Sequence, residues 1–320
     1  MGKTFCLLSL QFGHIGHGSI PATGADTVNR QQIKNKLDAY ERLMRLDRPI
    51  GILLLLWPTL WALWLAGNGS PNPFVVWIFI LGTILMRSAG CVMNDLADRD
   101  FDGLVERTRF RPLATGEVRI KEASLLAACL SLIAFVMVLF LNKLTIWLSF
   151  VALALAMTYP LTKRFIAIPQ AYLGMAFGFG IPMAYAALTN SLPLIVWALI
   201  AANLFWVIAY DTEYAMVDRE DDLKIGIKSS AIFFGRYEIV AIMACYGLML
   251  GILLLIGIWQ GFLWPYYLGV GSAGGIMLYH YRLIRTRDRN NCFRAFLHNN
   301  WVGASVFIGI IASSWFKHQG

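Results

Sequence analysis

Residues 74–102 read FVVWIFILGTILMRSAGCVMNDLADRDFD. An apolar run passes here without a break into a stretch in which four of the last eight residues are Asp. A helix needs about 20 predominantly apolar residues to cross the hydrocarbon core of a bilayer. The stretch therefore predicts a membrane-spanning helix over residues 74–93 whose end carries an acidic motif.

Apolar runs of this kind recur along most of the chain. Its 320 residues are 58% hydrophobic and 14% charged, which is too apolar for an ordinary soluble domain of this length. The other predicted spans cover residues 49–66, 123–141, 144–161, 166–188, 192–210, 239–258, 262–281 and 301–316. We therefore expect an all-α polytopic membrane protein with nine transmembrane helices in residues 39–320. Residues 1–38, rich in Gly and polar residues, are expected to form a loosely structured extension.

The distribution of basic residues predicts the orientation in the membrane. With nine spans, 25 of the 27 Lys and Arg fall on one side, and only Lys143 and Lys317 fall on the other. Basic loops mark the cytoplasmic side, so the N-terminus is expected in the cytoplasm and the C-terminus in the periplasm of a bacterial inner membrane. The extension lacks the Arg-rich amphipathic pattern of a mitochondrial targeting segment. The net charge of +8 forms no basic stripe, which excludes nucleic acid as a partner.

Two acidic motifs with related spacing are predicted at the cytoplasmic ends of two spans. Fourteen of the 19 acidic residues lie within residues 95–122 and 211–238. On continuing helices, each motif places its members on one face: Asn94, Asp98 and Asp102 in the first, and Asp211, Asp218 and Asp222 in the second. Asp98 and Asp218 are 120 residues apart, which indicates a duplicated helical unit and predicts Asp-rich loops that cap the bundle.

Clustered carboxylates favour a bound cation, because like charges at i and i+4 repel. A donor set of oxygens without His or Cys is typical of Mg²⁺. The candidate metal ligands are Asn94, Asp98, Asp102, Asp218 and Asp222. Basic residues nearby supply candidate phosphate ligands, although basic cytoplasmic loops are also expected from topology alone: Arg99, Arg107, Arg111, Lys163, Arg164, Lys224 and Lys228. Arg87 lies about two turns inside the predicted span and is a candidate ligand for an anionic substrate group.

These motifs resemble the signatures of the UbiA superfamily of intramembrane prenyltransferases. The resemblance rests on Asn94-Asp95-x-x-Asp98-x-x-x-Asp102 with the following RTRFRPLATG of residues 107–116, and on YDTEYAMVDREDD of residues 210–222 with KIGIKS of residues 224–229. It covers roughly residues 40–316, and the second motif is similar to that of the branch that prenylates 4-hydroxybenzoate for ubiquinone biosynthesis.

The resemblance implies a helix bundle around a central cavity that opens to lipid, with two Mg²⁺ ions bridging the diphosphate of a polyprenyl diphosphate. By matching positions, Asp98, Asp102, Asp218, Asp222 and Arg164 would be catalytic. Arg87, Asn94, Arg99, Arg107, Arg111, Lys163, Asp211, Lys224 and Lys228 would bind substrate. The expected reaction joins the prenyl group to the ring carbon ortho to the hydroxyl of 4-hydroxybenzoate, whose carboxylate is held by Arg87 or Arg164.

Other readings of the sequence remain. Another UbiA-type enzyme would use a different acceptor, such as homogentisate, a dihydroxynaphthoate or haem. A CDP-alcohol phosphotransferase is excluded, because Asp102-Gly103 does not continue into the D-G-x-x-A-R element of that class. A divalent-cation or organic-anion transporter would also need intramembrane charge. Against transport, the charges lie at cytoplasmic ends and no apolar segment is visibly broken at mid-membrane.

Overall fold

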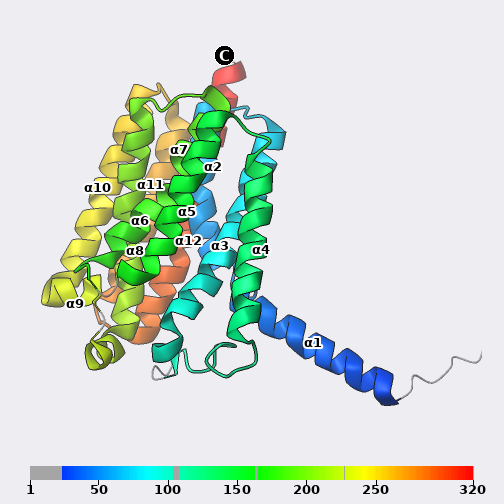
Figure 1. Cartoon of the computed structure of the whole chain (residues 1–320). Helices are drawn as coiled ribbons and strands as arrows, with labels where there is room; N and C mark the ends of the chain where they lie inside the picture. The colour runs from blue at the N-terminus through cyan, green and yellow to red at the C-terminus, as the bar shows by residue number, and fades with distance from the viewer. Residues whose placement is uncertain (1–23, 104–107, 163–164, 227, 320) are drawn as a thin grey trace, which may run out of the picture. The chain divides into compact units, whose positions relative to one another are not determined.

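A computed structural model of the chain describes residues 24–103, 108–162, 165–226 and 228–319, and every regular element within these ranges is a helix (Figure 1). The chain divides into two units, residues 1–38 and residues 39–320. Helix α1 runs over Gly24–Met44. Helix α1 thus includes residues 24–38 of the predicted extension, and residues 1–23 lie outside the described residues.

The second unit is a bundle of long helices, coloured from blue to red in Figure 1. After the end of α1, its elements are α2 (Ile50–Ala66), α3 (Pro73–Asp102), α4 (Ile120–Val138), α5 (Lys143–Thr162), α6 (Pro169–Gly178), α7 (Gly180–Thr189), α8 (Leu194–Ile225), α9 (Ser230–Phe234), the 3₁₀ turn η1 (Gly235–Tyr237), α10 (Glu238–Trp259), α11 (Trp264–Ile284) and α12 (Arg289–Gln319). Large side chains fill the centre of the bundle, where Trp61 of α2 stacks on Trp206 of α8 at 5.3 Å between ring centroids.

The chain is a polytopic membrane protein. Within the described ranges, seven segments are long and apolar enough to cross a membrane: 73–100, 120–138, 143–162, 169–189, 194–224, 230–259 and 289–317. Helix α2 is apolar but shorter, and α11 occupies the remaining predicted span. Each predicted span thus coincides with a helix or a helix pair, and the crossing of the membrane by all nine stays a prediction.

The predicted span 166–188 is interrupted near its middle, contrary to the expectation of an unbroken segment. Helix α6 ends at Gly178 and α7 begins at Gly180. Pro182 has no N–H to donate back toward Gly178, so the hydrogen-bond ladder is broken there. Phe179 between them keeps right-handed helical angles, φ −71° and ψ −13°, so the break is local and does not unwind the chain.

Two helices are long enough to carry the acidic motifs out of the hydrocarbon core. Helix α3 has 30 residues and α8 has 32. At 1.5 Å per residue they are roughly 45 Å long or more, against a core of about 30 Å. Helix α8 ends where Gly226 takes a left-handed conformation, φ 73°, which glycine adopts without strain.

Candidate functional site

A large cavity of 1220 Å³ lies inside the second unit. Along α3 its wall changes from apolar residues such as Phe79 to the polar pair Asn94 and Asp95, a distance of about 24 Å for 16 residues of helix. Phe135 of α4 and Phe150 of α5 add to the apolar part. The cavity is therefore suited to a molecule with a long apolar portion and a charged end.

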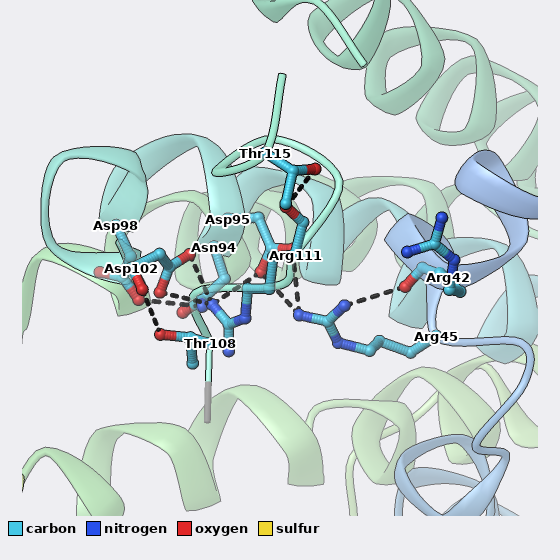
Figure 2. A network of polar contacts seen from close by, with 9 residues as sticks. All are labelled: Arg42, Arg45, Asn94, Asp95, Asp98, Asp102, Thr108, Arg111 and Thr115. Carbon is cyan, nitrogen blue, oxygen red and sulfur yellow. Dashed lines mark hydrogen bonds and ion pairs between the residues drawn. The ribbon is translucent and has the colours of Figure 1, made fainter. Parts of the chain in front are cut away.

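The polar end is organised by an ion-pair network around Asp95, shown in Figure 2. The Arg111 guanidinium contacts Asp95 at 3.0 Å and both oxygens of Asp102 at 2.9 and 2.8 Å. Arg45, from the turn after α1, donates to both oxygens of Asp95 at 2.9 and 3.0 Å. Asp95 is only 1% exposed. Two guanidinium groups thus converge on one buried carboxylate at the edge of the cavity.

The first acidic motif is only partly assembled as predicted. Asn94 and Asp98 do share a face of α3, and the Asn94 side-chain amide donates to Asp98 at 3.0 Å. Asp102 is buried and is bound by Arg111, while its backbone carbonyl accepts a hydrogen bond from Thr108 at 2.8 Å. Burial raises the pKa of the Asp102 carboxyl, and Arg111 opposes that shift. Asp102 would have to exchange Arg111 for a cation in order to act as a metal ligand.

The second acidic motif lies along the last turns of α8. Asp211 lines the large cavity, whereas Asp222 and Lys228 line a separate smaller one of 300 Å³. Asp218 lies between them on the helix and lines neither cavity. Among the described residues, the structure brings together no group of three or more His, Cys, Asp or Glu arranged to hold a metal ion.

The structure places the predicted basic residues in different environments. Arg111 and Arg87 line the large cavity. Arg99 pairs with Asp100 at 3.4 Å, and Lys224 pairs with Asp221 at 3.3 Å, in both cases toward the surface. Lys228 donates to the carbonyl of Phe165 at 3.2 Å. The predicted ligands Arg107, Lys163 and Arg164 lie outside the described residues.

The residues between Asp218 and Asp222 anchor the end of α8 to the first residues of α10 and α12. Glu220 pairs with Arg289 at 2.9 Å. Arg219 lies 3.8 Å from the buried carboxylate of Glu238, which also accepts from Arg287 at 2.6 Å. These contacts hold the helix end that carries the second motif.

Arg87 is placed deep in the cavity wall, as its position in the sequence predicted. Its guanidinium lies over the ring of Phe177, 5.6 Å from the centroid. Gly51 on α2 makes room for it, since a Cβ there would stand 2.6 Å from the guanidinium. The Arg87 Nε is buried and has no hydrogen-bond partner in the part of the chain that the structure describes.

A buried polar network behind the cavity wall was missed by the sequence analysis. Asn299 of α12 donates to Glu213 of α8 at 2.9 Å, and its carbonyl accepts from Trp206 at 2.8 Å and from Tyr246 at 3.0 Å. Tyr246 of α10 also donates to Glu213 at 2.9 Å and lies 3.2 Å from Nδ1 of His280. His280 of α11 is fully buried in this network.

The signals for the missed residues were weak. Glu213 was counted with the acidic loop because the predicted span ended at residue 210, three residues before it. Arg45 could not be told from other basic residues of the cytoplasmic side. Asp95 adjoins Asn94 but lies off the i, i+4 face that the motif suggested.

Comparison with known proteins identifies the family. The UbiA prenyltransferase family profile matches residues 55–303. The chain belongs to the UbiA prenyltransferase family. A UbiA relative from Methylobacillus flagellatus, named 4-hydroxybenzoate octaprenyltransferase, is 65% identical over 285 residues, which are 89% of this chain and 96% of the relative.

Solved structures share the UbiA fold. The apo structure of a UbiA homologue from Aeropyrum pernix K1 has a TM-score of 0.72 and 25% identity, and the match covers 81% of this chain and 97% of that one. A UbiA homologue from Archaeoglobus fulgidus bound to GPP and Mg²⁺ has a TM-score of 0.65 and 19% identity, covering 86% of this chain and 99% of that one. The UbiA fold thus extends over most of the second unit.

Proposed function

We propose that this UbiA-family chain transfers a polyprenyl group from polyprenyl diphosphate to the ring carbon of 4-hydroxybenzoate ortho to the hydroxyl, releasing diphosphate, as a step of ubiquinone biosynthesis. The observation that carries the proposal is the cavity, whose wall runs from apolar to charged over about 24 Å of α3. The name of the Methylobacillus flagellatus relative supports the choice of acceptor. We place the reaction at the cytoplasmic face of a bacterial inner membrane, with the N-terminus inside.

In this proposal the two ends of the cavity bind different parts of the polyprenyl diphosphate. The apolar part receives the polyprenyl chain and keeps water away from the allylic carbon, where an intermediate cation would otherwise be quenched. At the charged end, Arg111 and Arg45 hold diphosphate oxygens and stabilise negative charge as the C–O bond breaks. Arg111 reaches the diphosphate by releasing Asp102, so the network of Figure 2 supplies both the charge and its positioning.

The donor set at the acidic motifs fits Mg²⁺. Mg²⁺ commonly binds through one or two carboxylates, waters and substrate phosphates, and so it does not require a preformed cluster of three acids. Asn94 and Asp98 offer neighbouring oxygen ligands on α3, with Asp102 beyond them, and Asp218 and Asp222 offer carboxylates on α8. Bound at the first motif, whose Asn94 lines the large cavity, Mg²⁺ would neutralise the charge of the leaving diphosphate. Two ions are proposed, one for each motif, and the A. fulgidus homologue bound to GPP and Mg²⁺ supports the use of this metal.

Arg87 is proposed to bind the carboxylate of 4-hydroxybenzoate. It is seven residues, about 10 Å of helix, from Asn94, so an anion at Arg87 would lie apart from the diphosphate. Its Nε lacks a hydrogen-bond partner among the described residues and is available to a ligand. Arg87→Ala should raise KM for the aromatic acid without changing KM for the diphosphate, whereas Arg99→Ala, on the exposed end of α3, should change neither.

The central experiment measures prenyl transfer in membranes that contain the chain, given 4-hydroxybenzoate and an allylic diphosphate. The proposal expects 3-prenyl-4-hydroxybenzoate that disappears with a chelator of Mg²⁺ and in both Asp98→Asn and Asp218→Asn. Asp100→Asn is the matched control, because Asp100 lies in the first motif but pairs with Arg99 at the surface.

The outcomes separate the alternatives. If product formed only with another aromatic acceptor, prenyl transfer would stand as the reaction and 4-hydroxybenzoate would be overturned as the acceptor. If no acceptor led to consumption of the prenyl diphosphate, the enzymatic proposal would be overturned and a transport function would be tested next.

A further inference from the structure

A tyrosine beside the large cavity has a hydroxyl without a hydrogen-bond partner among the described residues. Tyr210 of α8 is 1% exposed and lines the large cavity. Its hydroxyl is buried and has no hydrogen-bond partner in the ranges that the structure describes. Its ring is held from two sides, by Trp206 at 5.5 Å and Phe296 at 6.1 Å between centroids. A buried hydroxyl without a partner lowers stability, so its position needs an explanation.

Arg87, which lines the same cavity, has a second polar group of this kind. The Nε of Arg87 is buried and has no hydrogen-bond partner among the described residues, and Arg87 lines the same cavity as Tyr210. Asp211 and Tyr159, which are also titratable, line the same cavity. The Arg87 guanidinium donates only and a tyrosine hydroxyl can donate, so an anionic group with two oxygens would satisfy both.

We propose that Tyr210 is a specificity-determining residue whose hydroxyl donates to one carboxylate oxygen of the aromatic acceptor, while Arg87 binds the same carboxylate. This inference rests on the proposed function and names the groups that select its acceptor. Trp206 and Phe296 pack against the Tyr210 ring, and these contacts position the hydroxyl for that role.

The proposal predicts discrimination between acceptors of the same size. A site built to hydrogen-bond a carboxylate leaves polar groups unpaired when the acceptor lacks that group, and so rejects it strongly. The wild-type chain should therefore prefer 4-hydroxybenzoate over 4-isopropylphenol, which has no hydrogen-bond acceptor in place of the carboxylate, and loss of the Tyr210 hydroxyl should reduce that preference.

Tyr210→Phe tests the proposal, because it removes one oxygen and keeps the ring. We expect KM for 4-hydroxybenzoate to rise by about tenfold, as for a lost hydrogen bond to a charged group, with KM for the prenyl diphosphate unchanged. The thermal unfolding midpoint should be equal or higher, because an unpartnered buried hydroxyl is removed. A hydroxyl with a purely structural role would instead lower the midpoint and leave KM unchanged.

Tyr266→Phe is the matched control. Tyr266 is equally buried, lies on α11 away from the cavity, and donates to the carbonyl of Leu253 at 2.7 Å. This variant should lower the unfolding midpoint and leave KM unchanged, the opposite of the pattern expected for Tyr210→Phe.

A binding measurement separates this inference from the proposed function. The increase in unfolding midpoint caused by 4-hydroxybenzoate alone should be smaller in Tyr210→Phe than in the wild type. An equal increase in both proteins, or an unchanged KM in an active enzyme, would overturn the role of Tyr210. If 4-hydroxybenzoate stabilises the wild type and not the variant but no transfer occurs, the proposed reaction fails while the binding role stands.

Discussion

Replacing Asn299 by Leu should destabilise the bundle more than the same change at Asn300, the next residue of α12. Asn299 is completely buried and lies between α8 and α10. The change keeps the number and branching of the side-chain heavy atoms and removes all of its hydrogen bonds. The indole N–H of Trp206 then loses its acceptor, and Glu213 keeps only the Tyr246 hydroxyl.

The magnitude follows from the number of helix-to-helix hydrogen bonds lost. Three join Asn299 to other helices, at 2.9 Å to Glu213, 2.8 Å from Trp206 and 3.0 Å from Tyr246. Interhelical hydrogen bonds in membrane proteins contribute about 0.6 kcal/mol on average and about 1.7 kcal/mol at most. The free energy of unfolding should therefore fall by about 2–5 kcal/mol.

Asn300→Leu is the control from the next position on α12. Asn300 accepts one interhelical hydrogen bond, from Trp57 at 2.9 Å, so its loss should cost about 0.6–1.7 kcal/mol. Both variants would be unfolded by denaturant in detergent micelles and followed by tryptophan fluorescence. Equal losses in the two variants, or a loss of under about 0.5 kcal/mol for Asn299→Leu, would refute the view that this network holds α8 against α10 and α12.

Three further predictions concern other parts of the bundle. Asp95→Asn should lower the free energy of unfolding by about 1–3 kcal/mol, because two guanidinium groups lose their buried carboxylate; unfolding by denaturant measures this, and an unchanged midpoint would count against it. The hydrogen bond from Arg42 lowers the pKa of Glu117, so its stabilising effect should be present above the usual carboxyl pKa of 4.5 and be lost as the pH falls below it; unfolding midpoints of wild type and Glu117→Gln should then converge in acid. Gly269→Ala should cost about 1–3 kcal/mol, because its Cβ would stand 2.6 Å from the Ser305 carbonyl oxygen, whereas Gly271→Ala, with open space around it, should be neutral in the same assay.

Most of the architecture was predictable from local pattern. Apolar runs long enough to cross a bilayer locate every long helix from α2 to α12, because each such segment must satisfy its own backbone hydrogen bonds and helices do so locally. The acidic motifs were placed on α3 and α8 by spacing alone, and the Asn94–Asp98 contact follows from an i, i+4 relation within one helix. The interruption at Phe179 was not foreseen, although Pro182 and two flanking glycines signal it in the sequence.

The candidate site was predictable only where its residues share a helix. Arg87 could be singled out because a charge inside an apolar span is costly wherever the helix packs. Asp95 and Arg45 could not be paired from the sequence, since they are 50 residues apart and meet only when the turn after α1 reaches the end of α3. Arg111 could not be paired from the sequence either, because it lies in the loop between α3 and α4 and contacts Asp95 and Asp102 only in the folded chain.

The sequence alone thus determined that the chain is a helical membrane protein with oxygen-rich motifs at two helix ends, because hydrophobic length and helical period are properties of contiguous residues. The tertiary structure alone decided which carboxylates face the cavity, which are neutralised by arginine, and that Glu213, Tyr246, His280 and Asn299 form one buried network. The physical reason is that a polar group inside the bundle must find its partner on a neighbouring helix, and the rotation and approach of that helix are set by packing rather than by the segment that carries the group.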